Sequence, residues 1–73
     1  MPYASVKDLP ASLHAHLPLH AQEIYRSAFN NAWIEYGDRG SAQREQIAHR
    51  VARAAVKRKY EKFGDQWISR EGN

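Results

Sequence analysis

The stretch LPLHAQEIYRSAFNNAW, residues 17–33, decides the fold of this chain. Pro18 suits the first turn of a helix, where the missing N–H group of proline leaves no bond unmade. At 100° per residue the apolar side chains fill one half of a helix and the polar ones fill the other. We predict a helix from Pro18 to about Tyr36, ended by Gly37. Its core half is Ala21, Ile24, Tyr25, Ala28, Phe29, Ala32, Trp33 and Tyr36; its polar half is Gln22, Glu23, Arg26, Ser27 and Asn30.

Two further helices are predicted on either side of this segment. A short one over Pro10–His16 stops before Pro18, because a residue that precedes proline disfavours helical geometry. Ser41 is a good N-cap for a third helix over about Ala42–Lys62. Its apolar side is rich in alanine, so a second helix can approach it closely, and we expect it to pack against the aromatic helix. That side holds Ile47, Ala48, Val51, Ala52, Ala54, Ala55, Val56 and Phe63.

The two ends of the chain have extended patterns. Pro2 confines any strand in Met1–Val6 to an edge, and Gln66–Ile68 is a second short extended segment. Two strands alone are marginal in water, but helices beneath them supply the missing packing. We therefore predict a mainly α fold: one compact three-helix domain over residues 1–73, with a small two-strand ribbon that joins the N- and C-terminal segments.

Length and composition exclude several classes of protein. The chain has 73 residues and no cysteine, so disulfides, thiolate zinc sites and a cysteine nucleophile are excluded. No apolar run approaches the roughly 18 residues of a membrane span, and no signal peptide is expected. We expect a cytoplasmic protein. No nucleophile–base pattern or glycine-rich phosphate loop occurs, so we expect no enzyme activity and no cofactor.

Histidines and acids do not combine into a metal site. His14, His16 and His20 are close in sequence, but Pro18 interrupts the helix between them, and no carboxylate or thiol completes the set. Oxygen ligands for Ca²⁺ or Mg²⁺ are also few, because the loop Gly37–Ser41 holds a single acid. The sequence predicts no metal site.

Positive charge gathers in the second half of the chain. Residues 37–73 hold nine Lys and Arg against five Asp and Glu, and within Arg50–Lys62 only Glu61 opposes six cations. Cations near the C-terminus of a helix are also favoured by its dipole, so a solvated face is one interpretation. The other is an anion-binding or partner-binding stripe, whose candidate residues are Arg50, Arg53, Lys57 and Arg58.

A family resemblance rests on several short sequence motifs, which are spread over almost the whole chain. They are Met1-Pro2-Tyr3, Asp8-Leu9-Pro10, the stretch 17–33, Ala48-His49-Arg50-Val51-Ala52, Ala54-Ala55-Val56-Lys57 and Trp67. In these motifs the chain resembles the ChaB family. Its members are small bacterial, phage and baculoviral proteins labelled as cation-transport regulators. The resemblance implies small helical folds with a minor sheet, association with a membrane cation/proton antiporter, and DNA binding in some relatives.

Structural roles are expected for several residues of the stretch 17–33. Tyr25, Phe29 and Trp33 should lie in the core, His20 should bond to neighbouring groups in the first turn, and Asn30 should satisfy a loop or a helix terminus. The leading functional hypothesis is a non-enzymatic interaction module that binds a protein partner, such as an antiporter. The alternative is a weak, sequence-independent nucleic-acid-binding module that uses the basic face of the third helix.

Overall fold

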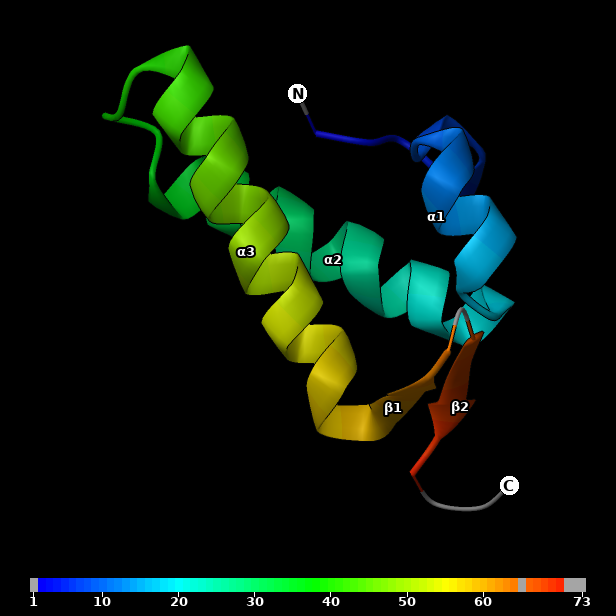
Figure 1. The fold of residues 1–73 in the computed structure, drawn as a ribbon. Helices are drawn as coiled ribbons and strands as arrows, with labels where there is room; N and C mark the ends of the chain where they lie inside the picture. Colours follow the sequence, from blue (N-terminus) through cyan, green and yellow to red (C-terminus); the bar gives the residue numbers. More distant parts are fainter. Residues whose placement is uncertain (1, 65, 71–73) are drawn as a thin grey trace.

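The computed structural model describes residues 2–64 and 66–70 and confirms a mainly helical fold (Figure 1). Met1, the first residue of the expected N-terminal strand, lies outside the described residues. A short 3-10 helix η1 precedes three α-helices and a two-stranded antiparallel hairpin. In chain order these are η1 (Val6–Asp8), α1 (Ala11–His16), α2 (Leu19–Glu35), α3 (Ser41–Lys59), β1 (Tyr60–Phe63) and β2 (Gln66–Ser69).

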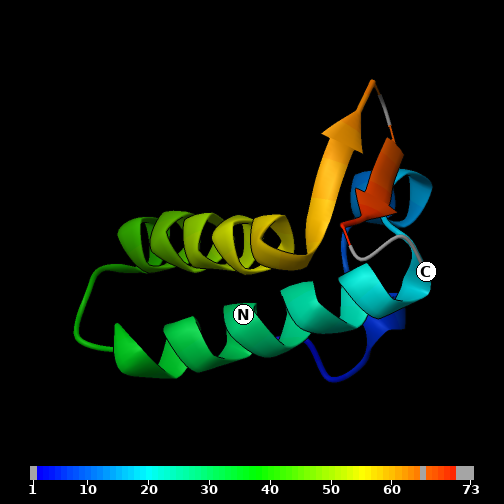
Figure 2. The ribbon, with the colours of Figure 1, turned by 90° about the horizontal axis from the view of Figure 1, so that it is seen from below.

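The pair α2 and α3 forms the largest contact in the fold, as predicted (Figure 2). Phe29 of α2 is fully buried, and Ala48 and Ala52 of α3 are equally inaccessible. The alanines have little volume of their own, so the rings of α2 fill the space between the two helices. The core cluster comprises Leu9, Leu17, Ala21, Tyr25, Phe29, Ala32, Ala48, Ala52, Val56 and Tyr60.

Helix α3 is shorter and differently capped than predicted. Gly40 is its N-cap, and Ser41, the predicted N-cap, is its first helical residue. The helix ends at Lys59 rather than Lys62, because the next four residues pair with β2. The apolar side is also narrower than the periodicity suggested. Val51 and Ala54 are exposed, since α2 covers α3 along one line of side chains, and Phe63, predicted on the same side, lies exposed on β1.

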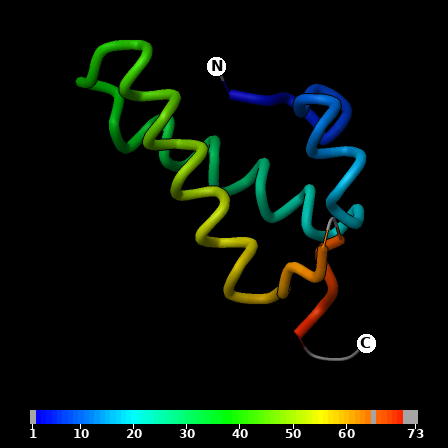
Figure 3. The backbone as a smooth tube through the Cα atoms, viewed as in Figure 1, coloured from blue at the N-terminus to red at the C-terminus, as the bar shows by residue number. Residues whose placement is uncertain are grey.

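The ribbon exists, and the predicted segment Gln66–Ile68 is one of its strands, but its partner is the preceding segment Tyr60–Phe63 and not the N-terminal segment (Figure 3). β1 pairs with β2 in antiparallel register, Tyr60 opposite Ser69 and Lys62 opposite Trp67. Gly64 lies in the turn with a φ of 60°, a conformation that glycine adopts without strain. Closing so short a loop costs little chain entropy, whereas pairing the distant N-terminal segment would cost more. The C-terminal segment therefore pairs with its neighbour in sequence.

The N-terminal segment is held by side chains instead of a strand. The Asn30 Oδ1 atom accepts a hydrogen bond from the Tyr3 N–H at 2.8 Å, and its Nδ2 donates to the Tyr3 carbonyl at 2.9 Å. Arg26 Nη1 donates to the same carbonyl at 3.2 Å. One amide side chain thus satisfies both backbone groups of a residue, as a neighbouring strand would. The prediction that Asn30 satisfies a loop is confirmed.

Helix α1 lies between two buried leucines. Leu9 precedes it and Leu17 follows it, so both of its ends are anchored in the core.

Gln22 was predicted on the polar side of α2, and this is wrong: only 7% of the residue is exposed. Its Nε2 donates to the Leu17 carbonyl at 2.8 Å and so satisfies a backbone acceptor in the turn before α2. A buried amide needs such a partner, and the helical wheel cannot reveal it.

Arg44 fastens the loop between α2 and α3. Its Nε donates to the Trp33 carbonyl at 2.7 Å, and its guanidinium lies 4.1 Å from the centroid of the Trp33 ring. Trp33 was expected inside the core, but it is only partly buried and packs at the edge, 6.0 Å from the Phe29 ring. A Cβ atom on Gly37 would approach Arg44 Nη2 to 3.2 Å, so this glycine suits the close approach.

Candidate functional site

All four predicted cations of α3 are exposed on its outer side. The opposite side of the same helix, with Ala48, Ala52 and Val56, is buried against α2. We call Arg50, Arg53, Lys57 and Arg58 the cationic face. The structure brings Arg50 and Arg53 together in one shallow depression, and Arg53 and Lys57 together in the next. Arg58 is exposed but lines neither depression, so Arg53 is the central member.

Arg70 extends this face from the far end of the chain. Its Nε donates to the Lys57 carbonyl at 2.8 Å, and its N–H donates to the Lys59 carbonyl at 2.8 Å. These carbonyls belong to the last turn of α3, where acceptors lack helical partners and a cation is favoured. Arg70 Nη1 also lies 3.6 Å from Glu61 Oε1 and so partly neutralises the acid of the basic run. Sequence reasoning missed Arg70, since only the hairpin register places it there.

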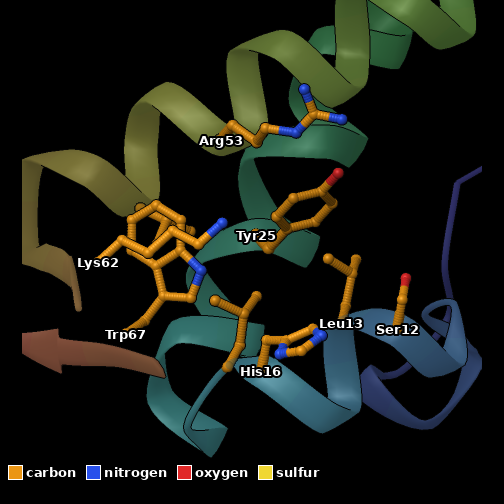
Figure 4. A pocket seen from close by; sticks show the side chains of 9 residues that line it. Ser12, Leu13, His16, Tyr25, Arg53, Lys62 and Trp67 are labelled. Carbon is orange, nitrogen blue, oxygen red and sulfur yellow. The ribbon is translucent and has the colours of Figure 1, made fainter. Parts of the chain in front are cut away.

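A cavity of about 190 Å³ opens beside Arg53, between α1, α2, α3 and the hairpin (Figure 4). The Tyr25 ring lies at its back, with Lys62 and Trp67 on one side and Leu13, His16 and Ser12 on the other. Lys62 and Trp67 come from opposite strands and face each other in the hairpin register. The complete lining is Ser12, Leu13, His16, Leu17, Tyr25, Arg53, Val56, Lys62 and Trp67.

A partly buried polar pair joins the cavity, which Tyr25 lines, to the outer depression, which His49 lines. The Tyr25 hydroxyl is hydrogen-bonded to Nδ1 of His49 at 2.5 Å. Burial lowers the pKa of His49; nearby Glu45 opposes this effect and Arg53 reinforces it. Burial also raises the pKa of Tyr25, and Arg53 partly offsets that rise. Burial therefore favours the uncharged form of both His49 and Tyr25, and these two neutral groups share the hydrogen bond.

His20 remains close to the surface in the first turn of α2. Its Nδ1 lies 3.5 Å from Glu23 Oε1, and its side chain is 68% exposed. The His20 ring also lies 6.4 Å from the Tyr60 ring. His20 therefore has a carboxylate within ion-pair distance, and its expected hydrogen bond to a neighbouring group stays a prediction. Of the other residues in the stretch 17–33, Tyr25 and Phe29 lie in the core as predicted.

Residues 2–64 and 66–70 include no group of three or more His, Cys, Asp or Glu side chains that could hold a metal ion. Within the same residues, no helix combines the length and the apolarity needed to cross a membrane. What these residues do offer is a run of cations and an adjoining apolar cavity.

The comparisons with known proteins agree across fold and sequence. A family model described as ChaB matches residues 9–70. A protein of Escherichia coli (strain K12) named "Putative cation transport regulator ChaB" is 52% identical over 69 residues, which cover 89% of this chain and 91% of that protein. A Shigella flexneri protein of the same name matches to the same extent.

The fold is also similar to a solved structure. The NMR solution structure of a protein with that same name has a TM-score of 0.86 and 49% sequence identity, and the match covers 94% of this chain and 99% of that one. Sequence similarity and fold similarity thus extend over the three helices and the hairpin alike. The chain belongs to the ChaB family.

Proposed function

We propose that this chain is a non-enzymatic cytoplasmic interaction module, which docks the cationic face of α3 on an acidic surface of a membrane cation/proton antiporter. The observation that carries this proposal is the exposure of Arg50, Arg53, Lys57 and Arg58 on one helix whose other side is buried. The name of the relatives, which refers to regulation of cation transport, supports a transporter as the partner.

The cationic face suits a partner that must be recognised quickly and released. Arginine pairs with carboxylates through two parallel hydrogen bonds, so an acidic protein surface fits it better than a single ion does. Each exposed pair contributes only about 0.2–1 kcal/mol, so four pairs give modest, salt-sensitive binding. The packed pair of α2 and α3 holds the face in place before the partner arrives, which lowers the ordering cost of binding.

Binding to a purified antiporter at two salt concentrations tests this function. The detergent-solubilised antiporter is immobilised, and the chain is titrated at about 50 mM and 500 mM salt, where screening of exposed charges differs severalfold. Charge reversal at Arg50 and Lys57 to Glu should weaken binding at low salt by about tenfold or more. Lys7→Glu with Arg39→Glu changes the net charge equally at exposed positions outside the cationic face and should leave binding unchanged.

Three results would overturn the proposal. One is the absence of binding at low salt, and another is equal binding by the α3 variant and the control variant. The third is binding to lipid vesicles without antiporter, at the same strength, which would contradict a protein partner.

Weak, sequence-independent nucleic-acid binding is the second candidate function. It is favoured by the continuation of the cationic face into a depression that also contains Lys62 and Arg70. Three or four phosphate contacts on duplex DNA predict a slope of about −3 to −4 in log affinity against log salt. Charge reversal at Arg50, Arg53 and Lys57 should flatten that slope. Fluorescence anisotropy across a salt series measures it; no binding at low salt removes this candidate, and tight sequence-selective binding makes it the first.

A further inference from the structure

The cavity beside Arg53 has an apolar interior and a positive rim. Leu17, Tyr25 and Val56 are buried in the core behind it, and the Tyr25 hydroxyl is already bonded to His49. The interior therefore presents ring and methyl groups rather than free polar atoms. Arg53 and Lys62 are exposed at its rim, and none of the described residues that line it is acidic.

The volume of the cavity limits what can enter it. A dry protein cavity of about 150 Å³ is large enough to hold benzene. This cavity, at about 190 Å³, is only slightly larger. Sites for drug-sized ligands and cofactors measure about 300–1,000 Å³. The occupant is therefore a single ring or one branched aliphatic group.

We propose that this cavity is the anchor site for the partner and takes one Phe or Leu side chain from a short acidic segment, whose flanking carboxylates meet Arg53 and Lys62. This proposal rests on the proposed function and names the chemistry that the partner must present. A bulky apolar group in a pocket supplies most of the binding energy of such contacts. Charges at the rim add specificity and a faster association rate.

The hairpin places the rim charge where the proposal needs it. Lys62 on β1 is the direct cross-strand partner of Trp67 on β2, so both side chains lie on one face of the ribbon. That face is turned toward the cavity, and Tyr60, two residues before Lys62, is buried on the same side. The other face carries Phe63 and Ile68, which are about half exposed. The Lys62 ammonium and the Trp67 ring therefore form one wall of the cavity (Figure 4).

The two tryptophans provide a signal and an internal control in one spectrum. Trp67 lines the cavity, whereas Trp33 lies under Arg44 near the loop between α2 and α3. A ¹H–¹⁵N correlation spectrum of the full chain gives one indole signal for each, and Trp67→Phe assigns them. The probe is an acetylated and amidated pentapeptide with one central Phe flanked on each side by two acids. It should shift the Trp67 signal saturably and leave the Trp33 signal in place.

Matched peptides separate the apolar anchor from the charges. Replacing the central Phe by Ala should weaken binding by at least about tenfold, because the buried ring is lost. Replacing the four acids by Lys should abolish the saturable shift. Phenylacetate carries the ring and one carboxylate alone, and it should bind the same site at about millimolar affinity. If phenylacetate bound as tightly as the peptide, the site would be one for small free acids and the partner proposal would be overturned.

A charge variant of the protein tests the rim. Lys62→Glu should weaken the acidic peptide by about threefold to tenfold, while Lys7→Glu, an equal change of charge away from the cavity, should not. Equal affinities of the Phe and Ala peptides, or equal shifts of both tryptophans, would refute the anchor site. Arg50→Glu makes the same change of charge as Lys62→Glu at a residue that lines neither the cavity nor the depression around Lys62, and it should weaken the peptide less than Lys62→Glu does. Loss of peptide binding with intact antiporter binding would thus remove only the anchor, not the proposed function.

Discussion

Helices α2 and α3 pack against each other but contribute different kinds of side chain. α2 brings volume, with Tyr25 and Phe29 buried among a few alanines. α3 brings a buried side of Ala48, Ala52 and Val56 and an outer side of cations. The difference shows how a 73-residue chain obtains both a core and a binding surface: one helix fills the interior, and the other lies close to it and keeps its long charged side chains on the outside.

The largest expected effect concerns the volume that α2 supplies. Phe29→Ala should reduce the free energy of unfolding by about 3–5 kcal/mol, because a fully buried ring leaves a cavity behind it. Urea denaturation followed by circular dichroism measures the change. Ile34 on the same helix is 74% exposed, so Ile34→Ala should stay within about 0.5 kcal/mol of the parent. Similar losses for the two variants would contradict the division between core and surface in α2.

The second prediction tests whether α3 needs small residues. Ala52 is fully buried against α2, so Ala52→Leu should force the helices apart and cost about 1–3 kcal/mol. Ala54→Leu makes the same substitution on the exposed side of α3 and should be nearly neutral. Thermal unfolding of both variants decides the matter. A neutral Ala52→Leu would mean that close approach of the helices is not what holds them together.

A third prediction extends the comparison to the N-terminal segment that α2 holds. Asn30→Ala removes both side-chain bonds to Tyr3 and should cost about 1–2 kcal/mol. The Tyr3 amide should also exchange its proton with water faster. Asn31→Ala, next to it on the exposed side, is the control. Unchanged exchange at Tyr3 would show that other contacts hold the segment.

The smallest effect is a pH dependence at the bond between the two helices. The folded state holds the pKa of His49 below its ordinary value of 6.5, chiefly through burial, so protonation favours the unfolded chain. Stability should be complete above about pH 6.5 and should decrease as the pH falls from there through the folded pKa. Urea midpoints at pH 7.5 and pH 5.5 should therefore differ less in His49→Gln than in the parent. His14→Gln, at an exposed position, should leave the difference unchanged.

Much of the fold could be predicted because its signals are local. Pro18 and Gly37 flank α2, and the periodicity between them identifies the buried side of that helix. The alanines of α3 predicted its close packing against α2, because small side chains allow two helices to approach and residue size can be read from the sequence. The candidate cations were found for the same reason: a dense run such as Arg50–Lys62 with one acid is apparent without any coordinates.

The sequence by itself thus determined the three helices, the α2–α3 pair, the exposed cations and the family. Only the tertiary structure decided the rest. It ends α3 at Lys59, gives Tyr3 a side chain as its partner instead of a strand, and places Arg70 on the last turn of α3. It also assembles the cavity from three helices and both strands of the hairpin. The physical reason is that each of these features is a contact between separate segments, and which segments meet depends on the loop-closure entropy of every competing pairing.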